Sequence, residues 1–153
     1  MAICINLTCT PVVNKVTECR LAESVVLSLC KTLSESFCHV YFDSFYTSPS
    51  LLLQLLDKGI HTIGTVRSNR KNMPKSLPDD KSMQRGDSVG LYANGISAVK
   101  WMDTRSVIHL SNMHDPNATG SDIRREKRRS QKIRLLCPTV VTDYNAHMGV
   151  ATS

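Results

Sequence analysis

Apolar and polar positions in the first part of the chain follow a helical period and then a strand-like run. An amphipathic helix from Leu21 to about Ser36 is predicted by apolar residues at helical spacing, namely Leu21, Val25, Val26, Leu29 and Leu33. The next apolar run, His39–Phe42, is short and rich in β-branched and aromatic residues. Such a run is typical of a strand buried in a parallel sheet.

A second helix and a second strand follow at once. Ser48 offers an N-cap oxygen and Pro49 is tolerated at the first helical position, so a helix is expected to begin there. Four leucines at positions 51, 52, 55 and 56 form one face, and Gly59 stands where a C-terminal cap belongs. The apolar run Thr62–Val66 predicts a second buried strand, and the alternation of helices and strands favours an α/β fold.

The pattern changes after Arg67. A polar, basic stretch over residues 67–82 predicts an exposed loop, and alternating segments around Asn94-Gly95 predict a small antiparallel insertion over residues 85–112. A turn cluster at 115–122 leads to a basic run, and residues 134–144 read as strand-like. We therefore expect a partial core over residues 1–67, a basic loop and β-hairpin insertion over 68–120, and a basic segment that returns to a truncated core over 121–153.

Composition favours one soluble, intracellular globular domain. The chain has 153 residues, of which 41% are hydrophobic, and no apolar run approaches the roughly 18 residues that span a bilayer. The start of the chain lacks the features of a secretory signal. Six cysteines therefore favour reduced thiols over disulfides, although the even number leaves a disulfide interpretation open. His109, His114 and the distant Cys137 do not match a zinc-binding pattern.

The charge points to an anionic partner, with nucleic acid as the first candidate. The formal net charge is +6 and the sequence pI about 9.1. Two basic clusters are candidate DNA-backbone contacts, and they comprise Arg67, Arg70, Lys71 and Lys75 in one and Arg124, Arg125, Lys127, Arg128, Arg129, Lys132 and Arg134 in the other. The second cluster also fits a nuclear localisation signal or a solvated charged loop. Trp101 fits hairpin packing better than a base-stacking role.

Five segments occur in an order that resembles one family. They are Asp43 followed by SFYTSP, the helix LLLQLLDKGI, TIGTVRSNRKNMPK, the hairpin end AVKWMDTR, and VVTDYNAHMG. Together they resemble the core of piggyBac-type transposases and their derivatives, from about Leu21 to Gly149. The resemblance implies a partial RNase H-like fold, that is, a mixed sheet with flanking helices carrying a small antiparallel β insertion. It also implies a DDE enzyme that holds Mg²⁺ (or Mn²⁺) ions with three aspartates, the second of which matches Asp43.

The sequence departs from that family at the other two aspartates. Residues 1–42 contain no aspartate, and Met148-Gly149 is followed by valine and alanine. Asp103 and Asp143 occupy other places in the resemblance. We expect a lone carboxylate to bind Mg²⁺ weakly, so the chain by itself should be inactive and not hold the ion stably. A sheet without its first strands would expose an edge, which residues 1–20 or a partner would have to cover.

These observations predict a nuclear, transposase-derived chain with residual, low-specificity DNA binding and no membrane association. Three alternatives stay open. The chain could be an interaction or adaptor protein without DNA binding, an active core completed by a partner or by missing sequence, or a fragment without a role.

Overall fold

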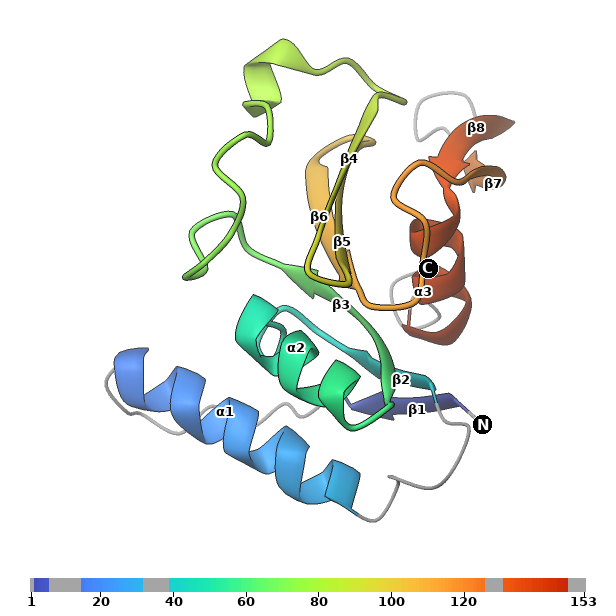
Figure 1. The fold of residues 1–153 in the computed structure, drawn as a ribbon. Coiled ribbons are helices and arrows are strands. Elements are labelled where there is room, and N and C mark those ends of the chain that lie inside the picture. The colour runs from blue at the N-terminus through green and yellow to red at the C-terminus, as the bar shows by residue number, and fades with distance from the viewer. Residues whose placement is uncertain (1, 6–14, 32–38, 126–130, 149–153) are drawn as a thin grey trace.

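The protein is described by a computed structural model over residues 2–5, 15–31, 39–125 and 131–148. These residues form a mixed α/β unit with one six-stranded sheet, in the order β1-β2-β3-β6-β5-β4, and a two-stranded ribbon, β7-β8 (Figure 1). The strands of the sheet are β1 (Ala2–Ile5), β2 (His39–Phe42), β3 (His61–Val66), β4 (Ser88–Ala93), β5 (Ile96–Met102) and β6 (Ser106–Ser111). The remaining elements are β7 (Thr119–Arg125), β8 (Lys132–Pro138), the helices α1 (Lys15–Cys30), α2 (Pro49–Asp57) and α3 (Thr139–Met148), and a short 3₁₀ helix, η2 (Asp80–Ser82).

The sheet has a parallel half and an antiparallel half. Strands β1, β2 and β3 run parallel, and β6 pairs antiparallel with β3. The Asn112 side chain extends this junction, since it accepts a hydrogen bond from Thr62 N at 2.7 Å and donates one to the Ile60 carbonyl at 2.9 Å. The expected antiparallel insertion is therefore not a detached unit but continues the core sheet through β6.

The two faces of the sheet carry different layers. Helices α1 and α2 pack on one face over Val40 and Phe42, and α3 with the β7-β8 ribbon packs on the other over Tyr41 and Ile63 (Figure 1). This division follows from the strand period, because successive side chains point to opposite faces. Trp101 is 2% exposed on the α3 face, which confirms the packing role expected for it.

Local signals around α2 and the β4-β5 hairpin are confirmed. The Ser48 hydroxyl accepts a hydrogen bond from Leu51 N at 3.1 Å, Pro49 opens the helix, and Gly59 follows its end with φ of 72°. Asn94 and Gly95 both have positive φ, as the two-residue turn of a hairpin requires.

Helix α1 differs from the prediction in its bounds and in its buried face. It begins at Lys15 and ends at Cys30, whereas residues 32–38 lie outside the described part of the chain. Ala22, Val26 and Cys30 are buried, while the larger apolar side chains are exposed, namely Leu21, Val25 and Leu29. The helix therefore turns Ala22, Val26 and Cys30 toward the core, a side that apolar size alone would not have selected.

Two further segments correct the expectations drawn from the sequence. Residues 139–144, taken as strand-like, open helix α3, in which Val140, Val141 and Tyr144 are buried at helical spacing. The basic run is not a loop throughout, because its two ends form β7 and β8 in antiparallel register.

The N-terminal residues partly fulfil the role expected of them. Ala2–Ile5 form β1 and pair in parallel with β2, so this strand lies at the edge where an incomplete sheet would be open. The thiols of Cys4, Cys30 and Cys137 are unbridged, and within the described residues no helix is long and apolar enough to cross a membrane.

Candidate functional site

Asp43 follows the last residue of β2 and organises a tight turn. One carboxylate oxygen accepts a hydrogen bond from Phe45 N at 2.9 Å. The Asp43 backbone carbonyl accepts from the Thr47 hydroxyl at 2.8 Å and from the backbone N–H groups of Tyr46 and Thr47 at 3.3 Å. The half-buried carboxylate therefore stabilises its own turn in addition to any other role.

Arg70 braces the same turn from the segment after β3. Its Nη2 donates to the carbonyl of Ser44 at 2.8 Å and to that of Phe45 at 2.7 Å. The side chain is half-buried, whereas the neighbouring cations Arg67, Lys71 and Lys75 are exposed. Of the four cations proposed from the sequence as DNA contacts in this segment, Arg70 thus has a structural partner on the protein itself.

Tyr144 from α3 closes the opposite side of the Asp43 turn. Its hydroxyl donates to the carbonyl of Phe42 at 3.1 Å. Burial raises the pKa of Tyr144, a nearby hydrogen bond with Thr65 opposes that shift, and the negative charge of Asp43 adds to it. The ends of β2 and β3 and helix α3 therefore meet at Asp43.

The described residues do not form a site for the two metal ions that the DDE family implies. They contain no group of three histidine, cysteine or acidic side chains that could hold a metal ion. Asp103 pairs with Arg85 at 3.0 Å, and Asp143 lies within another cluster. A pair of divalent ions needs several carboxylates converging on one point, so the side chains described around Asp43 do not fit that group.

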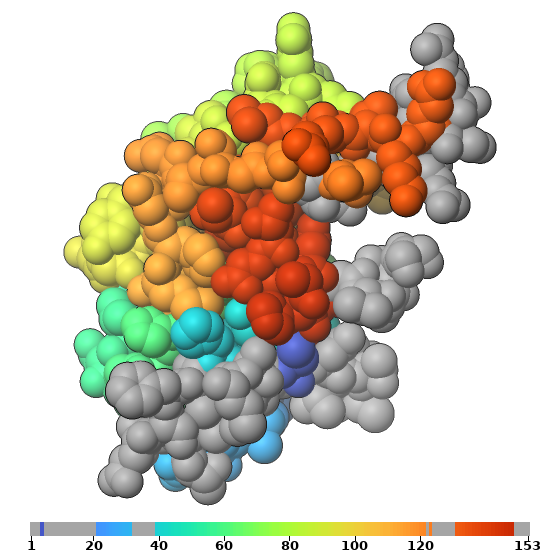
Figure 2. Space-filling view, turned by 90° about the vertical axis from the view of Figure 1, so that its right-hand side faces the viewer, coloured from blue at the N-terminus to red at the C-terminus, as the bar shows by residue number. Residues whose placement is uncertain are grey.

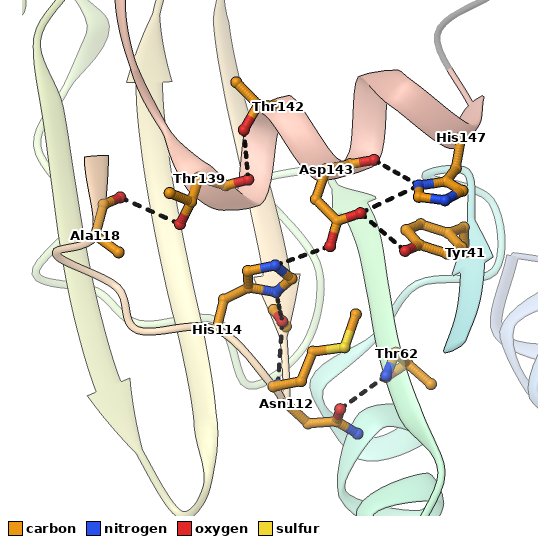
Figure 3. Close-up of polar contacts among 11 residues, drawn as sticks. Tyr41, Thr62, Asn112, His114, Ala118, Thr139, Thr142, Asp143 and His147 are labelled. Carbon is orange, nitrogen blue, oxygen red and sulfur yellow. Dashed lines mark hydrogen bonds and ion pairs between the residues drawn. The ribbon is translucent and has the colours of Figure 1, made fainter. Parts of the chain in front are cut away.

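Asp143 instead joins α3 to the sheet (Figure 3). Its carboxylate accepts a hydrogen bond from Tyr41 Oη at 2.9 Å and pairs with His114 Nε2 at 2.9 Å. His147 Nδ1 lies 3.1 Å from the carboxylate and 2.9 Å from the Asp143 backbone carbonyl. Burial and the hydrogen bond to Asp143 raise the pKa of Tyr41, while burial lowers the pKa of His114 against the opposing charge of Asp143. Asp143 and His147 belong to the late DYN-x-H segment of the sequence. Nothing in the spacing of that segment indicated Tyr41 and His114 as partners.

A serine completes a relay with this cluster. The Ser111 hydroxyl lies 2.9 Å from His114 Nδ1, and because Nε2 donates to Asp143, Nδ1 is left to accept from the serine. The order serine, histidine, aspartate is that of hydrolytic triads, but Ser111 is fully buried. A substrate cannot reach this hydroxyl. The contacts among Ser111, His114 and Asp143 instead hold the end of β6 against α3.

A small polar pocket next to the Asp43 turn was not anticipated. It has a volume of about 410 Å³ and is lined partly by Ser44, Thr65, Arg67 and Lys100. Lys100 is buried, and its ammonium donates to the Pro78 carbonyl at 2.6 Å and to Asp80 at 2.7 Å. This pairing, together with a hydrogen bond from Ser106, lowers the pKa of the exposed Asp80. A lysine in an apolar strand was the sequence signal for this feature.

The second set of predicted DNA contacts lies on the β7-β8 ribbon and the connection between its strands. Lys132 and Arg134 are exposed on β8, and the backbone of positions 124 and 125 belongs to β7. Lys127, Arg128 and Arg129 fall outside the described residues. The structure thus separates the two basic clusters, one in the segment after β3 and the other on the ribbon.

Comparisons with known proteins identify a family and, separately, a similar fold. The family model described as "Transposase IS4" matches residues 6–153. A cryo-EM structure of the piggyBac transposase synaptic complex with hairpin DNA is similar, with a TM-score of 0.63 and 24% sequence identity over 84% of this chain. The match covers 25% of that transposase chain, so the present chain spans about a quarter of its length. The expected partial RNase H-like fold and the resemblance to piggyBac-type transposases are confirmed.

Proposed function

This chain belongs to the transposase IS4 family, and from that membership we propose that it is a transposase-derived protein that binds DNA with low specificity and no longer cleaves it. The proposal rests on one contrast. Exposed cations lie in the segment after β3 and on the β7-β8 ribbon. Asp43, in contrast, stands without the converging carboxylates that strand cleavage with two metal ions needs, as far as the described residues extend.

The loss of cleavage is supported by how the other carboxylates are used. The Asp143 carboxylate contacts side chains of β2, of the loop after β6 and of α3 itself, and Asp103 is paired with Arg85. Moving either one to Asp43 would break these contacts. Within the described residues, Asp43 therefore has no candidate partner for a shared metal ion.

DNA binding is supported by the exposed cations and by the family. Arg67, Lys71 and Lys75 follow a core strand, and Lys132 and Arg134 extend from the ribbon. Cations that face solvent contact phosphates at any sequence, so they predict affinity without base specificity. The similar piggyBac transposase was solved with DNA, which is in keeping with such a partner.

The salt dependence of binding tests this proposal. Replacing Arg124, Arg125, Arg128 and Arg129 with glutamine should flatten the slope of log affinity against log salt concentration, by about 0.9 for each duplex phosphate that the variant no longer neutralises. Fluorescence anisotropy with a labelled duplex measures that slope. An unchanged slope would rule out phosphate contacts by the run, and no binding at low salt would reject the proposal as a whole.

A nuclear location follows as part of the same proposal, because the basic run has the composition of a localisation signal. A fluorescent fusion of the whole chain should accumulate in the nucleus, and the four-glutamine variant should not.

The enzymatic alternative is favoured by the length of the match, since the match covers only 25% of the similar transposase chain, whose remaining sequence has no counterpart here. Plasmid nicking with Mg²⁺ or Mn²⁺ tests it, with Asp43→Ala as the control. We expect equal, background-level nicking by both proteins. Metal-dependent nicking that Asp43→Ala abolishes would show that the carboxylate still takes part in catalysis.

An adaptor without DNA binding is the second alternative, and the outer face of α1 favours it. Leu21, Val25 and Leu29 are 46%, 40% and 51% exposed in one stripe along the helix. Sedimentation with and without DNA separates the two: a DNA-binding protein sediments faster when the duplex is added, and an adaptor does not.

A further inference from the structure

The β7-β8 ribbon has two different faces, which its register defines. Gly120 pairs with Cys137, and Asp122 with Leu135, so these positions share one face. Cys137 is buried and Leu135 packs against the core cluster on the α3 side of the sheet. Trp101 Nε1 donates to the Leu136 carbonyl at 3.3 Å, which ties the ribbon to β5. The inner face is therefore anchored to the body of the protein.

The outer face is exposed and combines cations with large aliphatic side chains. The described side chains of this face that face solvent are Thr119, Ser121, Ile123, Lys132, Arg134 and Leu136, whereas Pro138 at its end is buried. Ile123 and Leu136 are 57% and 65% exposed. They are diagonal neighbours on the paired strands, because Ile123 pairs with Arg134, two residues before Leu136. None of these six residues is acidic. The ribbon also stands out from the rest of the molecule at the upper right of Figure 2.

A face that carries exposed aliphatic side chains next to cations suits a nucleic-acid groove. Lysine and arginine can contact the phosphates on the groove walls, while an aliphatic side chain can contact a thymine methyl group on the floor. The major groove of B-DNA is about 12 Å wide and admits a two-stranded β-ribbon. Seven residues in each strand extend for about 23 Å, enough to follow the groove for part of a turn.

We propose that the outer face of the β7-β8 ribbon enters the major groove of duplex DNA, with Ile123 and Leu136 against the base edges and Lys132 and Arg134 on the flanking phosphates. This rests on the proposed function and adds to it the element, the groove and two residues that are not cations. The positive charge of this face favours a polyanionic partner, and the width of a two-stranded ribbon favours the major groove over the narrower minor groove. An acidic protein would satisfy the cations but would not supply the groove.

The test separates apolar contacts from charge contacts in the full chain. Ile123→Thr and Leu136→Thr keep strand-compatible residues on an exposed face, so folding should be unaffected. Each should lower duplex affinity by about tenfold, as expected when one largely buried aliphatic group is removed from an interface, and leave the salt slope unchanged. The double variant Lys132→Gln/Arg134→Gln should instead reduce the slope by about 1.8. Leu53→Thr, at a partly exposed position of α2, is the matched control and should bind like the parent protein.

Groove ligands and duplex type complete the experiment. A major-groove ligand such as methyl green should compete with the protein, and a minor-groove ligand such as netropsin should not. Double-stranded RNA, whose major groove is deep and narrow, should bind more weakly than DNA. Parental affinity of both threonine variants, competition by netropsin, or equal affinity for RNA would each overturn groove entry. Absence of any duplex binding by the parent protein would instead reject the proposed function itself.

Discussion

The turn after β2 and the outer face of the β7-β8 ribbon both depend on arginine, but they use it in opposite ways. Arg70 points into the protein and donates to two backbone carbonyls, whereas Arg134 is exposed on a strand face whose described side chains include no acid. The two residues come from segments of similar basic character. A cation of a basic run is therefore a candidate nucleic-acid contact only if it does not already donate hydrogen bonds to carbonyl groups of the protein.

The difference extends to how much each region tolerates change. The Asp43 turn is packed against β3, with Thr47 fully buried, and its carbonyls are saturated by local and distant donors. The outer face of the ribbon is solvated. Substitutions should consequently alter stability in the first region and binding in the second.

The largest effect is expected from a methyl group added at Gly64. A Cβ there would overlap Thr47 Oγ1 and approach Phe42 Cδ2 to 3.0 Å, so Gly64→Ala should lower the free energy of unfolding by about 2–3 kcal/mol. Gly120→Ala on the ribbon is the matched control, since its Cβ would meet nothing nearer than 3.9 Å. Chemical denaturation measures both. Equal stability of the two variants would remove the contrast between the regions.

A smaller effect is expected from removing each arginine. Arg70→Ala withdraws a donor from the carbonyls of Ser44 and Phe45 and should destabilise the protein by about 1–3 kcal/mol, while the salt slope of DNA binding stays constant. Arg134→Ala should change stability by less than about 0.5 kcal/mol and reduce the slope. If Arg70→Ala reduced the slope and left stability intact, Arg70 would be a phosphate contact like its neighbours.

The smallest effect is a pH dependence of stability that comes from His109, on strand β6 of the sheet. His109 is paired with Thr65 in the register and packs edge-on against Tyr144, with ring centroids 5.0 Å apart. Neither ring nitrogen has a hydrogen-bond partner among the described residues, and burial lowers the pKa of His109 to about 3. Between that value and the ordinary histidine pKa the unfolded chain binds the extra proton, so stability falls as pH decreases through this window.

Between pH 7 and pH 5.5 the contribution of His109 amounts to about 1 kcal/mol. His109→Leu should remove this part of the pH dependence, measured by denaturation at both pH values, and His61→Gln at the exposed start of β3 serves as the control. The same pH dependence in His109→Leu as in the parent protein would contradict the assignment.

Much of the region around Asp43 could be predicted because its signals are local. Ser48 caps α2 from three residues away, and Asn94-Gly95 turns a hairpin through its own backbone preferences. Which side of α1 is buried could not be predicted in the same way. Leu21, Val25 and Leu29 satisfy the helical period as well as Ala22, Val26 and Cys30 do, and only the packing of the folded chain shows that the second set is buried.

The amino-acid sequence by itself determined the order of helices and strands around α2, the position of Asp43 at a strand end, the family and the excess of positive charge. Each of these depends on neighbouring residues or on composition. Only the tertiary structure decided that Arg70 holds the Asp43 turn, that Asp143 binds Tyr41 and two histidines, and that the basic run forms part of a two-faced ribbon. The physical reason is that a hydrogen bond or a buried face depends on which distant backbone and side-chain atoms the fold brings together.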